Sequence, residues 1–259
     1  MIDLERAEKV FEDYSNNYDR NNLMMERKIE HTYRVKDNSN IIARSLNLIE
    51  EETNLATLIG LLHDIGRFEQ QRLAHGYNDL KTGIDHAKMG VKVLFDDKKI
   101  LDFLPDTRKY DKIIRIAIEN HNKFKIEENL SEEEIKFCKI IRDADKLDIL
   151  EIFVTNSEDI EAIGKNNGYA LSKDITEEFL DALFRGKQID RKYQNYFLDW
   201  YLNTLTFLFD INYPKSFEII KNKKYVDGTL DRIENLVPED KEIFEKIRAY
   251  MNKYVTDRL

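Results

Sequence analysis

Histidine and aspartate residues recur in this sequence in settings that could hold a metal ion. The chain has five histidines. Four of them stand in the motifs HTYRV, LLHDIGRF, DHAKMG and ENHNK, as His31, His63, His86 and His121. A later segment, IRDADKLDIL, holds Asp143, Asp145 and Asp148 among apolar residues. Imidazole nitrogen and carboxylate oxygen together are ligands that suit Mn, Fe, Co, Ni or Zn.

The pair His63-Asp64 follows two leucines and precedes Ile65, so we expect it to be buried in a helix. A buried aspartate costs several kcal/mol unless it is paired or binds a cation. Adjacent helical residues point roughly 100° apart, so one metal ion between them can contact both. The second oxygen of Asp64 can contact a second ion. The alternative is a helix-terminal pair before Gly66 that backbone groups satisfy, and the pair alone does not decide.

The segment around Asp145 predicts a long apolar helix in which at least one carboxylate must face inward. Asp145 and Asp148 are three residues apart and share a face of that helix. A single histidine is more often an ordinary core or surface residue than a ligand. The combination of four such histidines with aspartates in this order favours a metal site.

This order of residues resembles a known family. A histidine, a His-Asp pair and a distant aspartate follow one another, with RV three residues after His31, LLHDIGR around His63 and ADKL around Asp145. These features resemble the HD-domain superfamily of metal-dependent phosphohydrolases, over residues 25–153. The choice of Asp145 rather than Asp143 rests on the preceding alanine and the following Lys-Leu.

The resemblance implies an all-α fold, an HD-domain helical bundle with additional C-terminal helices. It also implies four ligands for a divalent metal, which are His31, His63, Asp64 and Asp145. His86 and His121 match the two extra histidines of family members that bind two metal ions. In those members an aspartate bridges the ions, and Asp64 matches that aspartate. We therefore expect two divalent transition-metal ions.

The chemistry that the resemblance implies is hydrolysis of a nucleotide or other small phosphoester by a metal-activated hydroxide. Asp64 would take part as the bridging ligand. Arg67, Lys123 and Lys146 each follow a proposed ligand closely, and we expect them to bind phosphate or stabilise transition-state charge. The alternative for each is an ordinary surface cation. His75 is a candidate general acid for the leaving group, and the alternative is a solvated loop histidine.

Two features argue against particular substrates. The branch that hydrolyses cyclic-di-GMP has a second histidine where this chain has Asn122, and its Gly-Tyr-Pro motif is absent. No synthetase motif for guanosine tetraphosphate follows the HD region. Two other functions stay open. One is an HD-fold di-iron oxygenase, because myo-inositol oxygenase and an organophosphonate-cleaving oxygenase use the same ligand set. The other is a nucleotide-sensing protein without catalysis.

Apolar residues spaced three and four apart predict helices along nearly the whole chain. These helices cover residues 4–14, 25–48, 51–66, 86–95, 106–121, 131–153, 176–184, 190–209, 214–222, 227–235 and 238–254. Residues 67–85 and 156–173 are predicted to be loops, and Ser131 with Glu134 forms a capping-box pattern. We expect residues 1–155 to form the catalytic core and residues 156–259 a helical extension packed on it.

Composition narrows the classes of partner. The 259 residues carry a net charge of −9, which argues against broad nucleic-acid binding but leaves a small anionic substrate open. The single cysteine, Cys138, excludes an intrachain disulfide. The N-terminus lacks the apolar stretch of a signal peptide, and no apolar run is long enough to cross a membrane. We expect a cytoplasmic protein without membrane contact, and a homo-oligomer is left open.

Overall fold

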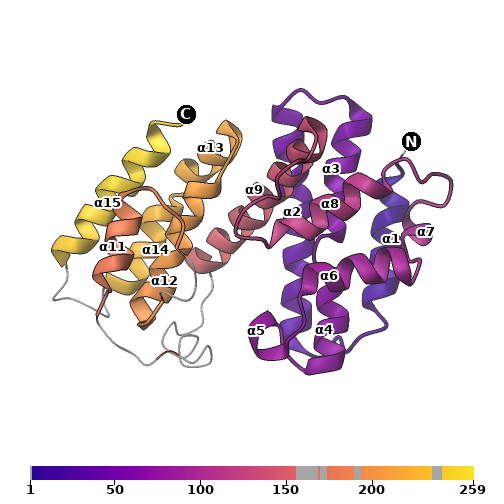
Figure 1. Cartoon of the computed structure of the whole chain (residues 1–259), viewed down its shortest axis with the longest axis horizontal. Coiled ribbons are helices and arrows are strands. Elements are labelled where there is room, and N and C mark those ends of the chain that lie inside the picture. Colours follow the sequence, from indigo (N-terminus) through magenta and orange to yellow (C-terminus); the bar gives the residue numbers. More distant parts are fainter. Residues whose placement is uncertain (1, 156–168, 170–173, 190–193, 235–240) are drawn as a thin grey trace. The chain divides into compact units, whose positions relative to one another are not determined.

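The computed structural model describes residues 2–155, 169, 174–189, 194–234 and 241–259. The chain divides into two compact units, residues 1–145 and 146–259, and the division lies within one long helix (Figure 1). Regular structure in the described residues is entirely helical, which confirms the predicted all-α fold. No described helix is long and apolar enough to span a bilayer.

The first unit consists of short and long helices that follow one another closely. They are α1 (Leu4–Ser15), α2 (Leu23–Ser45), α3 (Glu50–Leu62), α4 (Gly66–Ala74), α5 (Asp79–Thr82), α6 (His86–Val91), α7 (Ile100–Phe103), α8 (Asp111–His121) and the first part of α9 (Glu132–Thr155). A π-helical turn, Lys92–Asp96, continues α6. All the long predicted helices of this unit are present, with ends that differ by a few residues.

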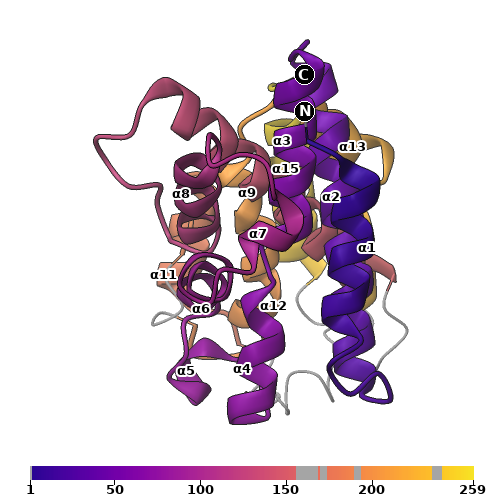
Figure 2. The same cartoon turned by 90° about the vertical axis from the view of Figure 1, so that its right-hand side faces the viewer.

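Two predictions about residues 51–85 are wrong. The helix predicted to reach Gly66 ends at Leu62, and a turn over His63, Asp64 and Ile65 precedes α4. The predicted loop over residues 67–85 contains α4 and α5. Figure 2 shows α4, α5 and α6 together at one end of this unit. The segment that was wrongly predicted to be a loop therefore forms part of the structure close to His63 and Asp64.

Helix α3 lies at the centre of the first unit, because every residue from Thr53 to Leu62 is buried. It packs against α2 at Gly60, where an added Cβ would lie 2.6 Å from Oγ of Ser39. Helix α4 packs against α6 at Gly66, where an added Cβ would lie 2.2 Å from the carbonyl oxygen of His86. These close approaches bring the ends of α3 and α6 near each other.

Helix α9 starts with the predicted capping box. The backbone amide of Glu134 donates to Oγ of Ser131 at 3.2 Å, and the amide of Ser131 donates to Oε2 of Glu134 at 2.7 Å. Further along α9, the buried guanidinium of Arg142 donates to the carbonyl oxygens of Asn120 and Lys123. Arg142 thus satisfies carbonyl groups at the C-terminus of α8, where His121 lies.

The second unit contains the end of α9 and five further α-helices among its described residues. They are α11 (Glu177–Phe184), α12 (Phe197–Thr206), α13 (Pro214–Asn222), α14 (Tyr225–Glu234) and α15 (Lys241–Thr256). Phe197 and Tyr201 of α12 are buried. The predicted loop over residues 156–173 lies almost entirely outside the described residues, including its Asn-Asn-Gly turn.

Candidate metal centre

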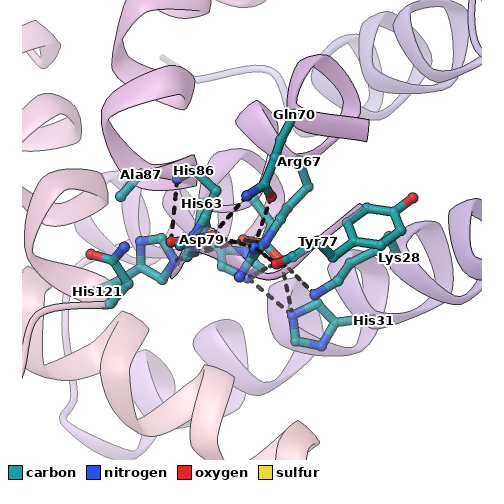
Figure 3. A network of polar contacts seen from close by, with 12 residues as sticks. Lys28, His31, His63, Arg67, Gln70, Tyr77, Asp79, His86, Ala87 and His121 are labelled. Carbon is teal, nitrogen blue, oxygen red and sulfur yellow. Dashed lines mark hydrogen bonds and ion pairs between the residues drawn. The ribbon is translucent and has the colours of Figure 1, made fainter. Parts of the chain in front are cut away.

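The six predicted ligands converge inside the first unit, although they come from distant parts of the sequence. His31 lies on α2, His63 and Asp64 in the turn after α3, His86 at the start of α6, His121 at the end of α8, and Asp145 on α9. Figure 3 shows the four histidines approaching one another. Among the six predicted ligands, two groups have ligand atoms within 4.8 Å of one another, His31 with His63 and Asp64, and Asp64 with His86 and His121; a third such group is Asp79 with Asp85 and His86.

The first group is completed by Asp145. The Nε2 atoms of His31 and His63 lie 3.2 Å apart. Oδ1 of Asp145 lies 3.3 Å from Nε2 of His31 and 3.8 Å from Nε2 of His63. Oδ2 of Asp64 lies 3.5 Å from Nε2 of His31. One oxygen from each aspartate therefore lies within 3.5 Å of Nε2 of His31.

The second group uses the other oxygen of Asp64. The Nε2 atoms of His86 and His121 lie 3.0 Å apart. Oδ1 of Asp64 lies 3.4 Å from Nε2 of His86 and 3.7 Å from Nε2 of His121. This oxygen is buried and accepts no hydrogen bond from the described residues. A buried carboxylate oxygen that accepts no hydrogen bond, beside imidazole nitrogens, fits a transition-metal ligand.

Hydrogen bonds to the far ring nitrogens orient three of the imidazoles. Nδ1 of His63 donates to the carbonyl oxygen of Gly60 at 2.8 Å, and Nδ1 of His121 donates to that of Ile118 at 2.7 Å. Nδ1 of His86 lies 2.6 Å from Oδ2 of Asp79. A carbonyl oxygen only accepts, so the proton sits on Nδ1 and the Nε2 lone pair stays free. This arrangement is usual for metal-binding histidines.

The protonation states of the cluster also suit a metal. Burial lowers the pKa of His63 to about 3 and lowers that of His86, so both rings are neutral at pH 7. Burial opposes ionisation of Asp64, but Lys28 and Arg67 outweigh it and hold its pKa well below the usual value. The pKa of Asp145 is also lowered, because bonding to His31 outweighs burial. Metal ions require neutral imidazole and ionised carboxylate ligands.

The predicted catalytic residues differ in how they lie relative to the histidine and aspartate cluster. Nε of Arg67 lies 3.4 Å from Oδ1 of Asp64, beside the cluster. Lys123 lies just after α8 and pairs with Glu127 at 2.5 Å. Lys146 belongs to the second unit, where it pairs with Asp210 at 2.7 Å. His75 ends α4 with a left-handed backbone (φ 51°) and an exposed side chain. Of these cations, the structure therefore brings Arg67 to the carboxylate.

Sequence reasoning missed Lys28 and Asp79. Nζ of Lys28 lies 3.0 Å from Oδ2 of Asp64, and its side chain is 23% exposed. Lys28 precedes His31 by three residues and so shares its face of α2, which was a usable signal. Asp79 contacts both His86 and Arg67. It lies in the segment misjudged as a loop, where no spacing rule relates it to a ligand.

Comparison with known protein families gives one match, which covers part of the chain. Residues 29–150 match the family model of the HD domain. This range includes all six converging ligands and ends near the residue where the sequence resemblance ends. No curated protein and no solved structure matches the chain at a significant level.

Proposed function

Because residues 29–150 form an HD domain, the domain of a superfamily of metal-dependent phosphohydrolases, we propose that this protein hydrolyses a small phosphoester with two divalent metal ions. The observation that carries the proposal is the split of Asp64, whose two oxygens face two separate histidine pairs. A carboxylate shared in this way is suited to hold two metal ions close together.

The ligands divide between two ions. His31, His63 and Asp145 would hold the first ion, His86 and His121 the second, and Asp64 would contact both. The four nitrogens and the carboxylate oxygens favour Mn, Fe, Co, Ni or Zn over calcium, which prefers six to eight oxygen ligands. When bound, such ions lower the pKa of a coordinated water towards about 7 and so supply hydroxide at neutral pH.

Two cations of the chain lie beside Asp64, and their positions support a role in binding the phosphoryl group. Nζ of Lys28 and Nε of Arg67 lie at different oxygens of Asp64, 3.0 Å and 3.4 Å away. Nε of Arg67 is buried and donates no hydrogen bond to the described residues. When metal ions occupy the oxygens of Asp64, Nζ of Lys28 and Nε of Arg67 would be available to oxygens of a phosphate. We assign phosphate binding to Lys28 and Arg67 rather than to Lys123 and Lys146.

The reaction class is tested with purified protein under anaerobic conditions. Nucleoside monophosphates and other phosphomonoesters and diesters are incubated with the Mn-loaded protein, and released phosphate or alcohol is measured. We expect turnover that a chelator abolishes and that Mn, Co or Ni restores better than Ca. Hydrolysis that persists in excess chelator would refute the proposal. Oxygen consumption by an iron-loaded sample, without anaerobic hydrolysis, would indicate an oxygenase instead.

A further inference from the structure

Helix α4 holds the segment around α5 through a buried glutamine. The amide nitrogen of Gln70 donates to Oδ1 of Asp79 at 2.9 Å, to Oγ1 of Thr82 at 3.0 Å and to the carbonyl oxygen of Ile84 at 3.0 Å. Its amide oxygen accepts from Arg67 at 2.8 Å. Gln70 is fully buried. The turn that carries Asp79 is therefore fixed against α4, and Figure 3 draws Gln70, Arg67 and Asp79 in this network.

The two oxygens of Asp79 face donors on opposite sides. Oδ1 accepts from NH1 of Arg67 at 2.8 Å as well as from Gln70. Oδ2 lies 2.6 Å from Nδ1 of His86. Arg67 and Gln70 carry only donors on this side, so Asp79 has one oxygen committed to them and one left for His86.

We propose that Asp79 is a positioning residue that fixes the tautomer of His86 and thereby makes its Nε2 available to the second metal ion. This inference rests on the proposed two-metal site. His63 and His121 owe their tautomers to main-chain carbonyl groups, which no side-chain change removes. Of these three imidazoles, only that of His86 depends on a side chain. Asp79 thus acts on the second ion through His86.

The substitution Asp79→Asn separates this role from simple loss of structure, because asparagine has the same shape. Arg67 and Gln70 both donate, so they favour the amide oxygen on their side. The amide nitrogen then faces Nδ1 of His86, which must accept, and the imidazole proton moves to Nε2. A proton on Nε2 blocks the lone pair that would bind metal. In the opposite orientation, the amide nitrogen of the new asparagine would face the donors of Arg67 and Gln70, which is unfavourable.

Two control variants match the test. Asp85→Asn removes the same charge next to His86 in sequence, and asparagine still caps α6, where Asp85 accepts from Ala87 and Lys88. Thr82→Val removes another contact of Gln70 and leaves the Asp79–His86 pair in place. We expect both controls to retain the wild-type His86 tautomer. Circular dichroism establishes that each variant is folded.

The first readout is nitrogen NMR of ¹⁵N-histidine-labelled, metal-free protein, with His86 assigned from a His86→Ala spectrum. We expect the Nδ1-protonated tautomer in the wild type and in both controls, and the Nε2-protonated tautomer in Asp79→Asn. An unchanged His86 signal in folded Asp79→Asn protein would overturn the proposal. This readout needs neither metal nor turnover, so it stands apart from failure of the proposed hydrolase function.

The second readout is the binding of Mn, measured by isothermal titration calorimetry. We expect Asp79→Asn to bind the first equivalent like the wild type and the second at least tenfold more weakly, within the range of 10–100-fold usual for such partners. Equal loss of both equivalents, or loss of neither, would contradict the assignment to the second ion. A wild-type protein that binds no metal would instead refute the proposed function, whatever the tautomer of His86.

Discussion

Nζ of Lys28 lies 3.0 Å from Oδ2 of Asp64, 36 residues further along the chain. The ammonium group of Lys28 therefore pairs with the same oxygen of Asp64 that faces His31. Because the side chain of Lys28 is 23% exposed while that of Asp64 is 4% exposed, the lysine lies on the solvent side of the pair. A phosphate that approaches the cluster would meet Lys28 next to the carboxylate of Asp64.

Replacing Lys28 should weaken substrate binding without emptying the metal site. We expect Lys28→Met to raise KM for the phosphoester about tenfold or more, because a charge-assisted bond to phosphate contributes about 1.5–3 kcal/mol. The metal content should stay at the wild-type value. The matched control is Lys88→Met, which removes an exposed lysine two residues after His86. Similar kinetics for the two variants would exclude Lys28 from phosphate binding.

Acid should destabilise the metal-free protein, beginning below about pH 6.5. Burial holds the pKa of His63 at about 3 and lowers that of His86, so both stay neutral in the folded state where the unfolded chain binds protons. Each such group lowers the free energy of unfolding by at most about 1.4 kcal/mol per pH unit as pH falls. Urea unfolding between pH 8 and pH 5 measures this, and a flat profile would contradict the neutral cluster.

Much of the candidate site could be predicted, because ligand types and their order along the chain are local properties of the sequence. His31, the His63-Asp64 pair and Asp145 stood out in this way. The split of Asp64 between two histidine pairs could not be predicted, since it depends on how α2, α6, α8 and α9 meet around one turn. The expectation that Asp64 bridges two ions came from the sequence resemblance, and the structure gives the distances from its two oxygens to the two histidine pairs.

The segment between the ligands shows where sequence patterns fail. LLHDIGRF continues the helical spacing through His63, so nothing in the pattern marks the turn that ends α3. Helix α4 has a mainly polar sequence and α5 is a single turn, and both are fixed by contacts of the buried Gln70. Such tertiary contacts override local propensity. Asp79 was missed for this reason.

Gly66 should tolerate no side chain. An added Cβ would lie 2.2 Å from the carbonyl oxygen of His86 and 2.3 Å from the amide nitrogen of Gly90. Gly66→Ala should therefore separate α4 from α6, cost about 1–3 kcal/mol of stability and weaken binding of the second ion. Thermal unfolding and Mn titration measure both effects. Gly76→Ala, whose Cβ would meet Thr82 at 3.4 Å, is the control and should unfold like the wild type.

Metal analysis of folded variants can show whether two metal ions share Asp64. We predict about two ions per chain for the wild type, about one for His86→Ala and for His121→Ala, and close to none for Asp64→Ala. The histidine variants should lose most turnover, because the second ion no longer helps to supply hydroxide or hold the phosphate. If His86→Ala and His121→Ala keep both ions and full activity, the shared two-metal site does not exist.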